Sequence, residues 1–208
     1  MITKNDYSIA DPKYFHNLFQ SQKVLKAATF AFLEDTGTAT GSPAHGTTQG
    51  TTVTDVNWKN SGSVGTAYTA APITAGNNSF EKWQYGKFSG TFNQILNGLF
   101  AHTAGTCGTG VVLKGAPACT GDGDRLLYTT PSATTNSNLT NTMTSAISIG
   151  SGVSVCFGAT GPEATGKATS MTTNPCYTNY LTTQLQTSGS AAAGDISSLT
   201  LTLQYNEN

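Results

Sequence analysis

Charged side chains are scarce in this sequence: Asp, Glu, Lys and Arg make up 10% of its 208 residues, whereas an average soluble domain carries about 25%. The ten basic residues are scattered, apart from Lys4, Lys13, Lys23 and Lys26 near the N-terminus. Nucleic-acid binding depends on clustered Lys and Arg that displace counterions from phosphates. We therefore expect no direct nucleic-acid partner, and we interpret the four N-terminal lysines as a solvated face.

Long apolar runs are also missing. No run approaches the roughly 18 residues of a membrane span, so we expect no membrane partner. Residues 1–22 lack the apolar stretch of a secretory signal peptide, although the neutral, Thr- and Gly-rich composition is typical of extracellular proteins. A virion protein satisfies both observations, because it is made in the host cytoplasm and becomes extracellular when the particle is released. We therefore expect a virion location.

Thr, Ser, Asn and Gly take the place of the missing charges. Thr accounts for about one residue in six, far above its usual share, and its branched side chain fits a pleated, half-solvated surface. Gly, Ser and Asn supply the turns between strands. The clearest strand is the last, expected over about 195–205, where Leu199, Leu201, Leu203 and Tyr205 alternate with polar residues, the pattern of a strand with one buried face.

About eight short strands with no βαβ alternation predict a mainly β chain. We expect an antiparallel two-sheet sandwich, jelly-roll-like, over residues 23–208, with the last strand paired in its interior and long Thr/Gly-rich loops at 35–50, 59–79 and 131–143. The segment 80–92 carries aromatic residues on both faces, so both faces of that strand are expected to be covered. Strands are expected at 23–35, 51–58, 80–92, 111–114, 125–130, 146–150 and 153–158, a short helix at 92–102 and a helical turn at 179–186.

The N-terminal segment 1–22 is predicted to be an arm with a short helix. Asp11 suits the N-cap and Pro12 the first helical position. A helix of about three turns is marginal in water, so its apolar face should be buried against its own sandwich or, as we favour, against an adjacent copy. The candidate assembly contacts are Tyr14, Phe15, Leu18 and Phe19.

The four cysteines, Cys107, Cys119, Cys156 and Cys176, allow three pairings. Neighbours in the sequence favour Cys107–Cys119 and Cys156–Cys176, because each pair brackets a Gly-rich loop. Free buried thiols are the alternative in a reducing compartment. Zinc is not expected, because no Cys-x-x-Cys occurs and no histidine lies near a cysteine.

Catalytic motifs are missing. His16, His45 and His102 belong to no nucleophile–base signature, and Asp122 and Asp124 in the sequence TGDGDR are interpreted as a hairpin turn, because the further carboxylates of a calcium loop are missing. We expect no enzymatic activity, no cofactor and no metal.

Aromatic residues leave one binding function open. Trp58, Trp83 and Tyr85 would stack on a carbohydrate if they were exposed together in a groove, whereas packing in the core is the simpler interpretation. A carbohydrate ligand therefore stays an alternative.

The C-terminal sequence AAAGDISSLTLTLQYNEN resembles the closing strand of small β-sandwich structural proteins of bacteriophage particles. The similarity lies in Gly194-Asp195 before the strand, the alternating Leu/Thr run, and the end Tyr205-Asn206-Glu207. It implies a virion structural protein, as a capsid, cement, decoration or tail component, whose partners are copies of itself and other particle proteins. The alternatives are a secreted fibre or pilus-type subunit and a carbohydrate-binding module of a particle.

Overall fold

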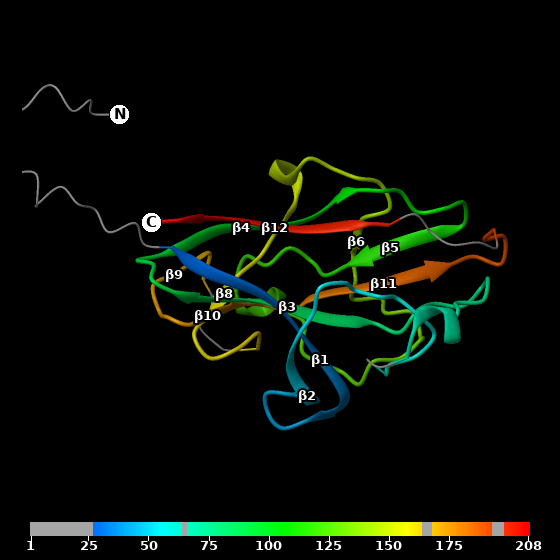
Figure 1. Ribbon diagram of the computed structural model, residues 1–208, viewed down its shortest axis with the longest axis horizontal. Helices are drawn as coiled ribbons and strands as arrows, with labels where there is room; N and C mark the ends of the chain where they lie inside the picture. Colours follow the sequence, from blue (N-terminus) through cyan, green and yellow to red (C-terminus); the bar gives the residue numbers. More distant parts are fainter. Residues whose placement is uncertain (1–26, 64–65, 164–167, 193–197) are drawn as a thin grey trace, which may run out of the picture.

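The computed structural model describes residues 27–63, 66–163, 168–192 and 198–208 (Figure 1). The predicted N-terminal arm, with its helix and its four contact residues Tyr14, Phe15, Leu18 and Phe19, lies outside the described residues. The described part is mainly β, with two antiparallel sheets, as the composition and the alternating segments predicted. Its helical elements are three short 3-10 turns, η1 (Tyr68–Ala70), η2 (Asp122–Asp124) and η3 (Ile149–Ser151).

The larger sheet, which we call sheet A, has eight strands. Its main path runs β2-β1-β3-β11-β5-β6, while β10 pairs with β3 and β8. Every pairing in it is antiparallel. The strands are β1 (Ala28–Thr40), β2 (His45–Thr52), β3 (Lys82–Gly90), β5 (Val111–Gly115), β6 (Asn141–Thr142), β8 (Phe157–Gly158), β10 (Cys176–Thr178) and β11 (Leu181–Thr187).

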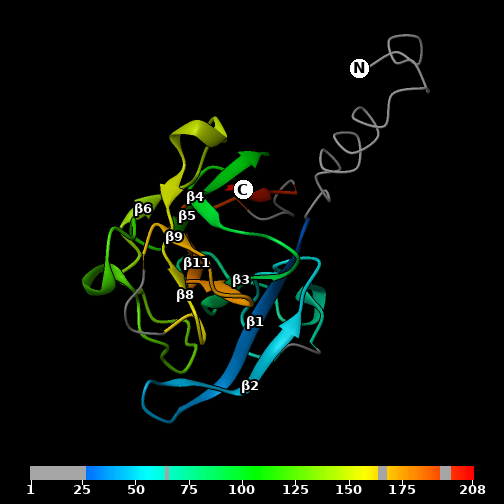
Figure 2. The same cartoon turned by 90° about the vertical axis from the view of Figure 1, so that its left-hand side faces the viewer.

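The smaller sheet, sheet B, has four strands. The long strand β4 (Ile95–Ala104) pairs with β12 (Thr200–Glu207), β7 (Val153–Ser154) and β9 (Ser170–Met171). In Figure 1, β4 and β12 form the upper layer over the strands of sheet A. Figure 2 shows the β1–β2 hairpin projecting away from that layer.

The main core lies between the two sheets. Phe88 from sheet A and Ile95 and Phe100 from sheet B are each 2% exposed or less and belong to one apolar cluster. Fully burying one such side chain contributes about 1.5–3 kcal/mol. Tyr205 of β12 stacks edge-on against Phe88, with ring centroids 4.6 Å apart, so the last strand contributes to the same core.

Sheet A also has a covered outer face. Leu33, Trp83, Tyr85, Tyr128 and Tyr180 form a second buried cluster there, away from sheet B. Residues Lys82 to Gly86 are consequently all buried, which confirms the prediction that both faces of this strand are covered.

Several predicted elements are wrong. The segment predicted as a helix at 92–102 is strand β4, and the predicted helical turn at 179–186 is largely β11. Ile95, Leu96, Leu99 and Phe100 fit a helical period, but pairing with β12 along nearly the whole strand outweighs that local preference. Residues 35–50, predicted as a loop, belong to the β1–β2 hairpin. The predicted strands at 125–130 and 146–150 do not form, and most of 51–58 is irregular.

The last strand exists but occupies a different position from the predicted one. Among the described strands, β12 pairs only with β4, which places it at an edge of sheet B and not in its interior. The alternation of apolar and polar residues indicates that one face of the strand is buried. It does not indicate whether one or two neighbouring strands form hydrogen bonds with its backbone.

Both predicted cysteine pairings are wrong. The disulfide joins Cys119 to Cys156, with their Cα atoms 5.4 Å apart, while Cys107 and Cys176 are free thiols. The reason is a long-range contact: the Cys119 amide donates to the Ser154 carbonyl at 2.8 Å, which brings the chain after β5 beside β7. Cys176 instead lies on β10, opposite Phe88 of β3. Neighbours in the sequence are therefore not neighbours in the fold.

Candidate functional site

Strand β12 leaves one side of sheet B open. It pairs with β4, and no described strand pairs with its other edge. Its outward side chains include Thr202, whose hydroxyl bonds that of Thr103 at 2.7 Å. Its inward side chains, among them Leu201 and Leu203, pack against the main core while staying only partly buried. Unpaired edges are the places where a sheet accepts a further chain.

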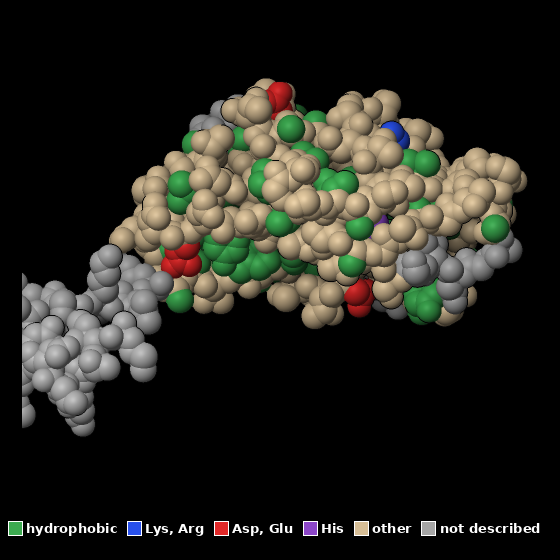
Figure 3. All heavy atoms as spheres, turned by 90° about the horizontal axis from the view of Figure 1, so that it is seen from above, with side chains coloured by type: hydrophobic (Ala, Val, Ile, Leu, Met, Phe, Trp, Pro, Cys, Tyr) green, Lys and Arg blue, Asp and Glu red, His purple; other side chains and the backbone are tan. Residues whose placement is uncertain are grey.

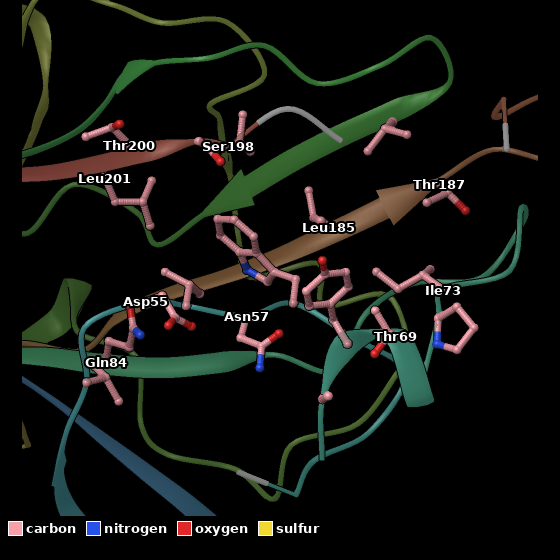
Figure 4. A pocket seen from close by; sticks show the side chains of 18 of the residues that line it. Asp55, Asn57, Thr69, Ile73, Gln84, Leu185, Thr187, Ser198, Thr200 and Leu201 are labelled. Carbon is pink, nitrogen blue, oxygen red and sulfur yellow. The ribbon is translucent and has the colours of Figure 1, made fainter. Parts of the chain in front are cut away.

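A groove of about 1420 Å³ lies beside β12 (Figure 4). The sheets form its floor and one wall, and the connection between β2 and β3 forms the opposite wall. We call this feature the β12 groove. Its main lining residues are Phe32, Val53, Asp55, Val56, Asn57, Trp58, Tyr68, Ile73, Gln84, Val111, Leu185, Leu199 and Leu201.

The groove exists because the two sheets differ in width. Eight strands of sheet A face four of sheet B, so part of the inner face of sheet A has no described strand above it. Phe32, Trp58, Ile73 and Leu199 pack against the core but are only partly buried there, unlike Phe88 beneath sheet B, which is fully buried. An apolar surface of this kind marks an interaction site more often than the scattered single residues of an ordinary surface do.

Charged groups are few in the groove, although eight of its 24 described lining residues are Thr, Ser, Asn or Gln. Among the described residues that line it, Asp55 is the only ionisable side chain apart from the phenol of Tyr68. Trp58 is held in place by its indole N–H, which donates to the Thr183 hydroxyl at 3.0 Å. Asn57 adopts φ +53°, and its Oδ1 is buried without a hydrogen-bond partner among the described residues.

A buried ion pair supports one end of the groove floor. Lys82 Nζ lies 3.3 Å from Glu34 Oε1, and the Gln84 amide donates to Glu34 Oε2 at 3.3 Å. Lys59 is buried nearby and donates to the Thr66 carbonyl. Burial, followed by repulsion from Lys82, lowers the pKa of the Lys59 amine. All these groups are partnered, so we interpret the cluster as part of the scaffold.

The aromatic residues considered for carbohydrate binding do not come together. Trp83 and Tyr85 are 2% and 6% exposed and lie in the cluster on the outer face of sheet A, whereas Trp58 lines the groove on the other face. The outer cluster is closed around Asp35, whose carboxylate accepts from Tyr180 OH at 2.6 Å and from the Gly50 amide at 2.8 Å. Burial, and then the Asp35 carboxylate, raise the pKa of Tyr180.

The described histidines have local structural contacts. His102 is fully buried, with Nδ1 2.6 Å from the Met143 carbonyl and Nε2 2.7 Å from the Ala104 carbonyl. His45 lies at the start of β2 and contacts Thr40. His16 lies outside the described residues.

The TGDGDR segment forms a short 3-10 turn, η2, but not the predicted hairpin turn, because the strand predicted after it at 125–130 does not form. The Asp124 carboxylate accepts from the Thr120 hydroxyl at 2.5 Å and from the Thr120 amide at 3.0 Å, and these bonds lower its pKa. Within the described ranges, no three His, Cys, Asp or Glu side chains gather as metal ligands would.

Sequence reasoning missed the groove. Its residues come from β1, β3, β5, β11, β12 and the connections before β3 and before β12, and no local motif joins them. The only feature of the sequence that pointed to the groove was Trp58, a large aromatic residue at the end of the predicted strand 51–58.

Comparisons with known proteins give no relative. The chain matches no protein-family model, no curated protein and no solved structure. No helix in the described part of the chain has the length and hydropathy needed to cross a membrane.

Proposed function

We propose that this chain is a structural subunit that works by assembling with copies of itself and with other proteins of a particle. The particle we propose is a virion, with the chain as a capsid, cement, decoration or tail component. The observation that carries the proposal is the β12 groove: no described strand covers part of the apolar inner face of sheet A, and no described strand pairs with the outer edge of β12 beside it. Such a surface is stable in water when another polypeptide covers it.

The size of the groove favours a polypeptide over a small ligand. Pockets for small molecules usually measure about 300–1,000 Å³ and enclose most of the ligand, while this groove measures about 1420 Å³. Figure 3 shows that one broad face of the molecule carries few charged side chains. A neutral, Thr-rich surface of this kind suits close contact between many identical subunits, because little charge has to be desolvated.

The disulfide supports a location outside the cytosol. Cys119 and Cys156 are bonded and both are fully buried, and structural disulfides persist mainly in oxidising surroundings. A virion protein meets such surroundings after release. We also propose that the strands of the two sheets are connected as in a jelly roll, and the antiparallel pairing in both sheets supports this.

The test is the assembly state of the purified full-length chain. We expect species heavier than the 21.5 kDa monomer in light scattering coupled to gel filtration, with their share rising with concentration. Leu201→Lys, inside the groove, should abolish them, while Gln204→Lys on the exposed side of the same strand should not. A wild-type chain that stays monomeric at millimolar concentration, alone and with the other particle proteins, would contradict the proposal. Electron micrographs separate closed particles from the filaments of a fibre or pilus-type subunit.

Carbohydrate binding is the second candidate. Trp58 and the 52% exposed Tyr68 both line the groove, together with the polar side chains of Asp55 and Asn57. Aromatic faces flanked by such groups suit a sugar ring. Calorimetric titration with oligosaccharides should then show binding that Trp58→Ala removes, without any change in assembly state.

A further inference from the structure

A short stretch of chain without strand pairing lies over the outer face of sheet A. Residues 128–132, which we call the strap, belong to the connection between β5 and β6 and are neither strand nor helix. The first of them, Tyr128, is 2% exposed and packs on Trp83 and Tyr180, with ring centroids 5.2 and 5.9 Å away. The strap therefore closes the aromatic cluster on the face of sheet A opposite to the β12 groove.

A buried carboxylate holds the backbone at each end of the strap. At one end the Tyr128 amide donates to Glu163 Oε1, and at the other the Ser132 amide donates to Glu81 Oε2. Glu163 and Glu81 are only 5% and 6% exposed. Among the described residues, one backbone–backbone bond joins the strap to a strand or its flank, from the Glu81 amide to the Ser132 carbonyl at 3.3 Å. The carboxylates, not a ladder of backbone bonds, therefore fix its ends.

Two uncharged contacts complete the attachment of the strap. Tyr128 OH donates to the Gly37 carbonyl at 2.7 Å, and the Ala39 amide donates to the Thr130 hydroxyl at 2.9 Å. Neither bond involves a charged side chain. The carboxylates are consequently the part of the attachment that responds to pH.

Docking of the strap leaves polar atoms without partners. Among the described residues, Glu163 Oε2, Trp83 Nε1 and Thr182 Oγ1 are buried and make no hydrogen bond. Trp83 and Thr182 are opposite one another on β3 and β11, so both side chains lie on the outer face. Unpaired polar atoms of this kind disfavour the buried arrangement, because water would satisfy them. The outer face therefore has a physical reason to open.

Ionisation weakens the attachment at both ends. Burial raises the pKa of Glu163 and that of Glu81, because a carboxylate shielded from water is disfavoured relative to the neutral acid. The hydrogen bonds from the Tyr128 and Ser132 amides lower these pKa values, but burial has the larger effect. A docked strap therefore favours protonated carboxyl groups.

The charged groups around the strap act mainly on Glu163. Asp35 of β1 raises the pKa of Glu163, whereas Arg125 and His45 of β2 lower it. At Glu81 the effects that oppose burial come from hydrogen bonds. Burial also raises the pKa of the Tyr128 phenol, which therefore stays an uncharged donor; the carboxylates that raise it further are Asp35, Glu34 and Glu81.

We propose that residues 128–132 are a pH-dependent strap, docked on the outer face of sheet A in acid and released as pH rises, so that Trp83 becomes accessible. Release brings the two carboxyl groups into water, where the ionised form is favoured. The stabilisation of the docked strap by bound protons is complete below the ordinary carboxyl pKa and is lost as pH rises through the raised pKa values. The strap and the β12 groove lie on opposite faces, so release does not require the proposed assembly.

The test is amide hydrogen exchange of the full-length chain at about pH 5 and about pH 8, corrected for the intrinsic effect of pH on exchange. The strap amides should lose protection at the higher pH while those of β4 keep theirs, because only the strap opens. Glu163→Gln and Glu81→Gln mimic the protonated groups, so each should reduce this loss and the double variant should abolish it. Asp124→Asn removes an exposed carboxylate on η2 and should behave as the wild type does.

Fluorescence gives a second readout of the same opening. The sequence has two tryptophans, Trp58 and Trp83, so Trp58→Phe leaves Trp83 as the only one. Quenching of Trp83 by acrylamide should increase with pH in this background. Adding Glu163→Gln and Glu81→Gln should keep it low at both pH values.

Four outcomes contradict the inference. Strap amides that are equally protected at both pH values would show that the strap does not open. An unchanged loss of protection in the double variant would mean that the two carboxyl groups do not control it. A parallel loss in β4 would indicate opening of the whole fold, and a Trp83 that stays shielded would show that the strap does not uncover it. If near-ultraviolet circular dichroism shows that the double variant is unfolded, the two single variants decide.

Discussion

Loss of the Cys119–Cys156 disulfide should destabilise this protein substantially. The bridge joins residues 37 positions apart. In the chain-entropy description, closing a loop of that length removes about 13 cal/mol/K from the unfolded chain, which corresponds to about 4 kcal/mol at 25 °C. Both cysteines are fully buried, so substitution adds the loss of local packing. Against a usual total of about 5–15 kcal/mol for a domain, this is a large share.

The measurement compares urea unfolding of the wild type with that of Cys119→Ala/Cys156→Ala. We expect the midpoint to fall by an amount equivalent to about 4 kcal/mol. Cys107→Ser is the matched control, because Cys107 is a free, half-buried thiol, and its effect should stay below about 1 kcal/mol. Alkylation of the denatured, unreduced wild type should modify two thiols. In the native state, Cys176 should not react at pH 8, because burial raises its pKa to about 11.

Two results would refute this reasoning. Alkylation of all four thiols without reduction would show that the bridge does not form. A double variant within about 1 kcal/mol of the wild type would show that the bridge does not restrict the unfolded chain as the entropy argument requires.

Three further predictions concern buried groups and close packing. Burial raises the pKa of Glu163, so the stability that its protonated form contributes is complete below its unfolded pKa and is lost as pH rises through its folded pKa. The free energy of unfolding should therefore fall as pH rises above about 4.5, and Glu163→Gln should weaken that dependence, or the assignment is wrong. Lys82→Met leaves Glu34 buried without its cation and should cost about 3–5 kcal/mol in thermal or urea unfolding, most of which Lys82→Met/Glu34→Leu should recover; an equally unstable double variant would contradict this. Gly98→Ala places a Cβ 2.4 Å from the Val155 side chain and should cost about 1–3 kcal/mol, whereas Gly108→Ala, with open space around it, should melt within a few degrees of the wild type.

Composition and local pattern were sufficient for the class of fold. The abundance of Thr and the alternation from Leu199 to Tyr205 predicted antiparallel sheets and a closing strand with one inward face, and both are present. Aromatic residues on both sides of the segment 80–92 predicted a strand covered on both faces, and Trp83 and Phe88 are indeed buried on opposite faces. These features depend on the period of the side chains, which a sequence displays directly.

Local pattern failed where two periods fit the same residues. Ile95, Leu96, Leu99 and Phe100 suit a helix as well as a strand, and the backbone pairing of β4 with β12 decides between them. That pairing joins residues about a hundred positions apart, so no window of the sequence contains it.

The site depended on tertiary structure even more strongly. The disulfide follows from the approach of Cys119 to Ser154, and the β12 groove from the unequal widths of the two sheets. The sequence by itself determined which side chains need burial, because hydrophobicity and period are local properties. Only the tertiary structure decided which of them remain partly uncovered, as Phe32 and Leu201 do, because burial depends on the neighbours that distant strands supply.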